Sequence, residues 1–149
     1  NKMDPLKALT LFCSNQSQIQ EYTQGIETPI FKLLRKHLPG PYTFVFRASK
    51  IVPKMMLTPI STICFRWPDH PITLAIAEML GRPILCSSLR ISDDQLYDDP
   101  QEIHDHFKKR VDAVVDGGSI FAEHSTIIDF SQGDPILLRQ GKGNSSWLE

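Results

Sequence analysis

Short apolar runs rich in β-branched and aromatic residues alternate along the chain with segments whose apolar positions recur every three or four residues. The runs predict strands, and the recurrence predicts helices with one buried face. Strands are expected over residues 8–13, 42–48, 62–67, 84–86, 111–115, 125–130 and 135–138, and helices over 17–24, 28–38, 71–80 and 101–110. This alternation predicts an α/β protein with an open, twisted, mixed sheet and flanking helices.

Proline and small polar residues mark where the helices begin. Thr28, Asp69 and Asp99 stand just before proline-led helical segments and are expected to cap them through their side chains. Asp69 and His70 are alternatively a catalytic dyad. Gly81 is expected to end the helix over 71–80. The apolar stripe expected to be buried on that helix is Ile72, Ala75, Ile76 and Met79.

Length and charge bound the classes of function. The 149 residues, 41% of them hydrophobic and 22% charged, suit one domain with a single core. A strand begins near residue 8 without a leading element, so we expect that this domain lacks its N-terminal part. The net charge of -1 gives no overall attraction to nucleic acid, so an anion site must be a local cluster of cations. Such clusters lie at Lys32, Arg35 and Lys36 and at Lys108, Lys109 and Arg110; each is alternatively a solvated helix face.

Cysteine usage points to a reducing compartment. Cys13, Cys64 and Cys86 are far apart and lie in apolar runs, so they are interpreted as buried free thiols. No Cys or His pattern has the spacing of a zinc site, so no structural metal is expected, and no apolar run is long enough to span a membrane. We expect a cytoplasmic protein, or alternatively one from the interior of a plastid or mitochondrion.

Several predicted strands have hydroxyl and guanidinium side chains at or just beyond their ends. The strand over 84–86 runs into Ser87 and Ser88 and then Arg90, and ligands in open α/β sheets bind beyond the carboxyl ends of strands. Hydroxyls and guanidinium groups together are what a phosphate or carboxylate site needs, because Arg binds oxyanions through two parallel hydrogen bonds. An ordinary polar loop is the alternative for each strand end taken alone. The other side chains of this kind are Thr62, Arg66, Ser125, Thr126 and Arg139.

Taken together, six segments in order resemble the YrdC family: PGPYTFVF over 39–46, TICFRWPDHP over 62–71, the serine at Ser88, DGG over 116–118, STIIDF over 125–130 and LLRQG over 137–141. The resemblance implies an open α/β fold with a concave, positively charged face and an association with RNA. It also implies an activity that joins ATP, L-threonine and bicarbonate into threonylcarbamoyl-adenylate, the donor for a tRNA modification.

The resemblance assigns roles to individual residues. It implies a nucleotide site, taking ATP with Mg²⁺, formed by Thr62, Arg66, Ser88, Ser125 and Arg139. Arg90 stands where the family has Asn, and the family's Lys-x-Arg would fall on residues 1–3, where both cations are absent; these departures resemble the YciO branch. The alternative is a module that binds double-stranded RNA or tRNA without catalysis, and unpaired strand edges would also favour a homo-oligomer. The RNA-binding candidates are Lys32, Arg35, Lys36, Arg90, Lys108 and Lys109.

Overall fold

A computed structural model describes residues 9–92 and 95–148. The chain divides into two compact units. The larger unit comprises the described residues up to Ser87 and those from Ser125 onward, and the smaller unit is Ser88–His124. Each unit is described by itself, and the expectation of a single domain stays a prediction.

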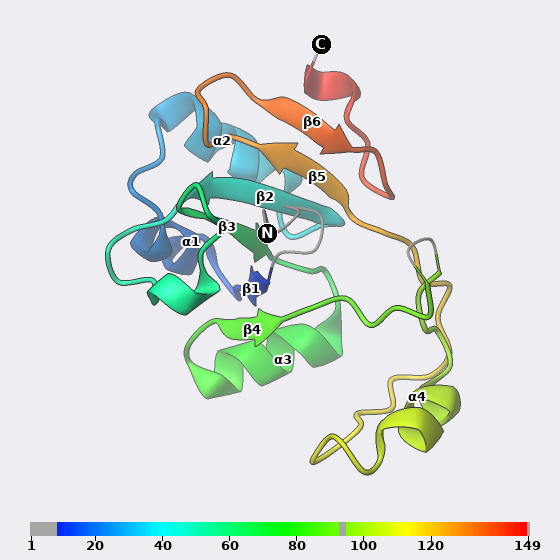
Figure 1. Ribbon diagram of the computed structural model, residues 1–149. Coiled ribbons are helices and arrows are strands. Elements are labelled where there is room, and N and C mark those ends of the chain that lie inside the picture. The colour runs from blue at the N-terminus through cyan, green and yellow to red at the C-terminus, as the bar shows by residue number, and fades with distance from the viewer. Residues whose placement is uncertain (1–8, 93–94, 149) are drawn as a thin grey trace. The chain divides into compact units, whose positions relative to one another are not determined.

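The larger unit is built on one mixed sheet of six strands (Figure 1). Their order is β4-β1-β3-β2-β5-β6. β1 pairs parallel with β3 and β2 with β5, whereas the β1–β4, β2–β3 and β5–β6 pairs are antiparallel. The predicted open, mixed α/β sheet is therefore confirmed. The strands are β1 (Thr10–Phe12), β2 (Tyr42–Arg47), β3 (Thr62–Arg66), β4 (Ile84–Cys86), β5 (Thr126–Asp129) and β6 (Ile136–Arg139).

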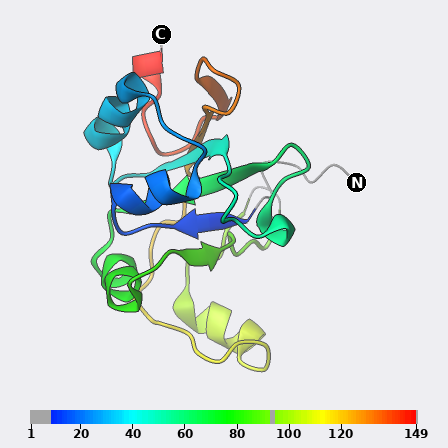
Figure 2. The same ribbon diagram turned by 90° about the vertical axis from the view of Figure 1, so that its left-hand side faces the viewer.

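Helices α1 and α2 cover one face of this sheet (Figures 1 and 2). Ile19 of α1 and Leu34 of α2 are fully buried against the rings of Phe44 and Phe65. The other face carries a smaller cluster of Val45, Cys64 and Ile127. Successive residues of these strands thus pack on opposite faces of the sheet, because side chains alternate in direction along a β-strand. The helices are α1 (Gln16–Tyr22), α2 (Thr28–His37), α3 (Pro71–Leu80) and, in the smaller unit, α4 (Pro100–Phe107), with short 3₁₀ turns at Lys54–Met56 and Ser146–Leu148.

Two of the expected helix caps are wrong and two are right. Glu27 precedes α2 without a side-chain capping bond, and Thr28 is already helical. His70, not Asp69, caps α3: its Nδ1 accepts a hydrogen bond from the Ile72 backbone N–H. Asp99 caps α4 as expected, and Gly81 ends α3 in the left-handed conformation. An Asp-His pair before a proline offers two possible acceptors, and sequence alone cannot choose between them.

The predicted strand over 111–115 is absent, and this stretch has neither helix nor strand. Val111 is 44% exposed and Val115 is 63% exposed. β-branched residues favour a strand only where a neighbouring strand supplies hydrogen bonds, and none pairs with this stretch in the described part of the chain.

The expected buried stripe of α3 is also wrong. Only Ala77 is buried on this helix, while Ile76 and Met79 are exposed. Cys13 and Cys64 are buried free thiols as expected, but Cys86 is only half-buried because β4 lies at the edge of the sheet. In the described residues, no helix is long and apolar enough to cross a membrane.

Candidate functional site

The face of the sheet turned away from α1 and α2 collects most of the predicted site residues. Ile63 and Phe65 point into the helix-side core, so their neighbours in β3 point the opposite way. Thr62 and Arg66 therefore lie on the same face as Val45 and Ile127. The alternation of β3 places a hydroxyl and a guanidinium group at its two ends.

Thr62 is held by a local turn. Its hydroxyl shares a hydrogen bond of 2.6 Å with the Thr58 hydroxyl, and its backbone N–H donates to the same oxygen at 3.1 Å. Ser61 completes the turn with a positive φ of 59°. Thr62 is almost fully buried, so its hydroxyl stabilises the turn before β3 through the bond to Thr58.

The guanidinium group of Arg66 has a hydrogen-bond donor that is not used within the described part of the protein. Its Nε is buried and has no hydrogen-bond partner, and its Cζ lies 5.2 Å from the centroid of the Phe12 ring. Burial lowers the pKa of Arg66, the neighbouring Cys86 opposes this change, and the Arg139 charge lowers the pKa further. The Arg139 charge therefore acts unfavourably on the charged form of Arg66. An oxyanion bound at this face would offset that effect and accept hydrogen bonds from the Arg66 guanidinium group.

Ser125 contacts both Arg139 and a buried hydroxyl of β2. Arg139 donates from Nε and Nη2 to the Ser125 carbonyl at 3.1 and 2.9 Å, and from Nη2 to the Ser125 hydroxyl at 3.4 Å. The Thr43 hydroxyl lies 2.7 Å from the Ser125 hydroxyl, and both are buried. The strands thus fix the direction of the Arg139 side chain through a backbone carbonyl.

The chain is similar to the proteins of one family along most of its length. The model of the Sua5, YciO and YrdC family, described as telomere recombination, matches residues 1–141. The chain belongs to this family. Escherichia coli YciO, an uncharacterised protein, is 34% identical over 137 residues, which are 91% of this chain and 66% of YciO. The threonylcarbamoyl-AMP synthase of Pyrococcus abyssi is 28% identical over 134 residues, which are 89% of this chain and 39% of that protein.

Solved structures of the Sua5/YciO/YrdC family confirm the fold. The crystal structure of E. coli YciO matches with a TM-score of 0.87 over 92% of this chain and 67% of that one, at 34% identity. The crystal structure of P. abyssi Sua5 complexed with L-threonine matches with a TM-score of 0.82 over 93% of this chain and 41% of that one, at 27% identity. The chain thus spans about two thirds of the length of YciO.

Two residues singled out by the family resemblance belong to the other unit of the chain. Ser88 and Arg90 belong to the smaller unit, where Ser88 is exposed and Arg90 forms an isolated bridge with Leu96. Their part in a common site with Arg66 stays a prediction. The residues 1–3 that would match Lys-x-Arg lie outside the described residues.

The cations proposed to bind RNA are divided between the two units. Lys32, Arg35 and Lys36 are exposed on α2, which covers the opposite side of the sheet. Lys108 and Lys109 are exposed in the smaller unit, where Lys108 forms an ion pair of 3.8 Å with Asp105. Arg90 belongs to the smaller unit as well, so whether these candidates act together stays a prediction.

Sequence reasoning missed Thr43 and Thr58. Thr43 alternates with Phe44 in β2, so its placement beside Ser125 follows once β2 and β5 are known to pair in parallel. Nothing in the sequence marks Thr58, because its contact with Thr62 depends on the shape of the turn between them. Among the described residues, no group of three or more His, Cys, Asp or Glu side chains is arranged to hold a metal ion.

Proposed function

We propose that the face formed by Thr62, Arg66, Ser125 and Arg139 binds the phosphates of ATP. The observation that carries this proposal is the buried Nε of Arg66, which has no hydrogen-bond partner among the described residues, together with the Arg139 guanidinium group that Ser125 holds in place. The part of Ser88, which belongs to the smaller unit, stays a prediction. Since no acidic cluster gathers in the described residues, Mg²⁺ would arrive bound to the phosphates.

The reaction that suits this site follows the chemistry of the family, which is related to threonylcarbamoyl-AMP synthesis. A threonine carbamate oxygen attacks the α-phosphorus of ATP, the bond from that phosphorus to the bridging oxygen breaks, and pyrophosphate leaves with the electron pair. Arg66 and Arg139 neutralise the charge that develops on the phosphate oxygens, and the sheet holds both in place before the ligand arrives. The match to a Sua5 crystallised with L-threonine supports threonine as the second substrate.

RNA binding remains a weaker candidate. The three cations on α2 are exposed, as on any solvated face of an amphipathic helix. Their arrangement in the described residues does not distinguish an RNA-binding surface from such a face.

Replacing Arg139 with Ala tests the proposal. We expect ATP with Mg²⁺ to bind about ten- to a hundredfold more weakly, because hydrogen bonds to a charged group contribute about 1.5–3 kcal/mol. Isothermal titration calorimetry measures this, with circular dichroism to verify folding. Arg35→Ala is the matched control, since it removes the same charge from the opposite side of the sheet. Equal losses in both variants, or no ATP binding by the unaltered chain, would contradict the proposal.

Thr43 is expected to act as a positioning residue at this site. If Thr43 donates to Ser125, the Ser125 hydroxyl accepts from Thr43 and Arg139 and its own proton is left for a phosphate oxygen. Thr43→Val removes that donor, so ATP should bind about three- to tenfold more weakly, the effect of one net hydrogen bond. Thr43→Ser should restore binding. Thr23→Val removes another buried hydroxyl, bonded to the Gln20 carbonyl, and should lower the melting temperature without weakening ATP binding.

A further inference from the structure

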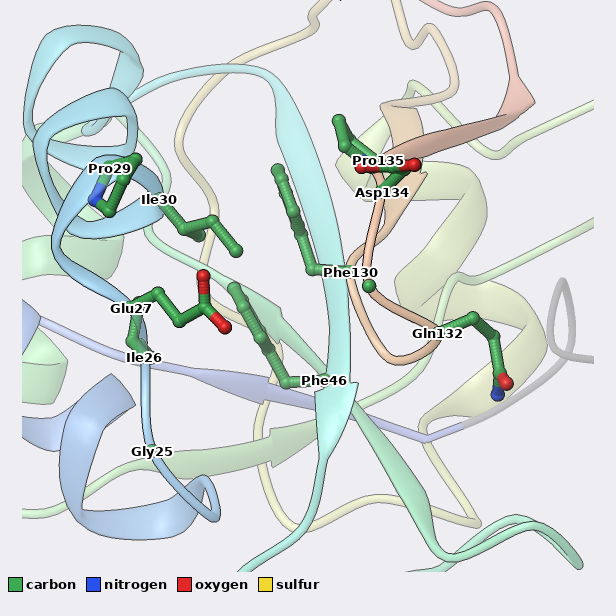
Figure 3. A pocket seen from close by; sticks show the side chains of 11 residues that line it. Gly25, Ile26, Glu27, Pro29, Ile30, Phe46, Phe130, Gln132, Asp134 and Pro135 are labelled. Carbon is green, nitrogen blue, oxygen red and sulfur yellow. The ribbon is translucent and has the colours of Figure 1, made fainter.

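A groove opens on the face of the sheet opposite to the arginines. Its volume is about 650 Å³, within the range of small-molecule sites. One wall is the segment that leads into α2, and the other is the turn between β5 and β6 (Figure 3). Both walls belong to the larger unit, so its shape is set within one compact body. The lining residues are Gly25, Ile26, Glu27, Pro29, Ile30, Phe46, Phe130, Gln132, Gly133, Asp134 and Pro135.

The base of the groove is aromatic. The rings of Phe46 and Phe130 stack with their centroids 5.3 Å apart and an angle of 10° between their planes. Ile30 stands beside them on the α2 side (Figure 3). Phe46 is 4% exposed and Phe130 is 6% exposed, so the two rings form a packed base, and the half-buried Ile30 adds apolar surface beside them.

Two carboxylates stand on the facing walls. Figure 3 shows the Glu27 carboxylate turned toward the space beside Phe46 and Phe130, while Asp134 lies on the other wall. Glu27 makes no capping bond to α2. Neither carboxylate has an ion-pair partner among the described residues. The lining contains no Lys, Arg or His, so the charge that its own side chains carry is negative.

Each wall turns at a glycine. Gly25 has a φ of 134° and Gly133 a φ of 106°, values that other residues rarely adopt. These two turns place Glu27 and Asp134 on facing sides of the aromatic base.

We infer that this groove binds a small organic amine that is protonated at neutral pH. The apolar body of the amine lies against Ile30 and the small exposed parts of Phe46 and Phe130, and the carboxylates of the two walls attract its ammonium group. The charge of the lining decides the class: carboxylates without a neighbouring cation repel phosphates and carboxylic acids and attract ammonium groups. The site is separate from the proposed nucleotide site, because the sheet stands between them.

Three probes of similar size separate charge from shape. Benzylamine, benzyl alcohol and benzoate are titrated into the ¹⁵N-labelled chain, and the amide shifts of the residues around the groove are followed. Benzylamine should shift the amides of Gly25, Glu27 and Gly133. Its affinity should exceed that of benzyl alcohol by about tenfold, and benzoate should not bind, as expected for two partly exposed charges at close range. Raising the salt from about 0.02 M to about 0.5 M should remove most of this preference.

Glu27→Gln and Asp134→Asn keep the shape and remove one charge each. Each should weaken benzylamine about threefold and leave benzyl alcohol unchanged. Glu21→Gln removes an exposed carboxylate of α1 that does not line the groove, so this variant should bind benzylamine normally. Equal affinity for benzylamine and benzyl alcohol, or shifts that Glu27→Gln does not reduce, would overturn the inference. The absence of shifts around the groove with any probe would overturn it as well.

Discussion

Raising the pH from 9 toward 12 should unfold the larger unit, because two thiols are buried in it as neutral groups. Burial raises the pKa of Cys13 to about 12, and burial together with the Asp129 carboxylate raises the pKa of Cys64 to about 12. The ordinary thiol pKa is 9.0. Above that pH the unfolded chain releases both protons while the folded chain keeps them. The folded state should therefore lose about 1.4 kcal/mol per pH unit for each thiol.

Urea unfolding at a series of pH values from 8 to about 11 measures this loss. Below pH 9 both states hold the protons, so the contribution of the thiols to stability is constant there. Tyrosines and lysines also titrate at high pH, so the informative quantity is the difference between the unaltered chain and the Cys13→Ala/Cys64→Ala variant. The variant starts less stable because it has lost buried atoms, but its stability should fall less steeply with pH. Parallel curves would show that the thiols do not carry the effect.

The sheet was predictable because its signal is local. In the stretch over 42–47, buried residues pack on both faces, and the run of aromatic and β-branched residues predicts a strand without knowledge of its neighbours. The ends of α3 followed from Pro71 and Gly81 for the same reason. The exposed Met79 shows where this reasoning stops. Periodicity tells which face of a helix is apolar, but not whether another element covers that face.

The site was predictable in its residue types and not in its contacts. The alternation of β3 is enough to place Thr62 and Arg66 on one face. The bonds from Arg139 to the Ser125 carbonyl depend on the antiparallel pairing of β5 with β6, which has an irregular register between Ile127 and Ile128. Such a bulge shifts which side chains oppose each other, and nothing in the sequence marks it.

Replacing Gly143 with Ala should detach the C-terminal segment from the sheet. A Cβ atom at this buried position would lie 2.5 Å from Cε1 of Tyr42 and 2.8 Å from its Cδ1. The ring cannot easily move aside, because it stacks on Phe44 at 5.6 Å and its hydroxyl donates to the Asn144 carbonyl at 2.9 Å. Overpacking of this kind costs about 1–3 kcal/mol of unfolding free energy.

The same change should reach the proposed site. Thr126 donates to the Gly143 carbonyl at 2.6 Å and accepts from the Gly141 N–H at 3.0 Å, so this segment is bonded to the residue that follows Ser125. ATP binding should therefore weaken together with stability.

A double-mutant cycle with Tyr42 separates a steric effect from a general one. Tyr42→Leu removes the ring that the new methyl group would meet, so Gly143→Ala should cost less free energy in that background. Tyr42→Phe keeps the ring and loses only the hydrogen bond to Asn144, so there the cost should stay as large as in the unaltered chain. Thermal or urea unfolding of the single and double variants gives each value. Equal costs in the Leu and Phe backgrounds would contradict the prediction, because they would show that the clash with the Tyr42 ring is not the cause of the lost stability.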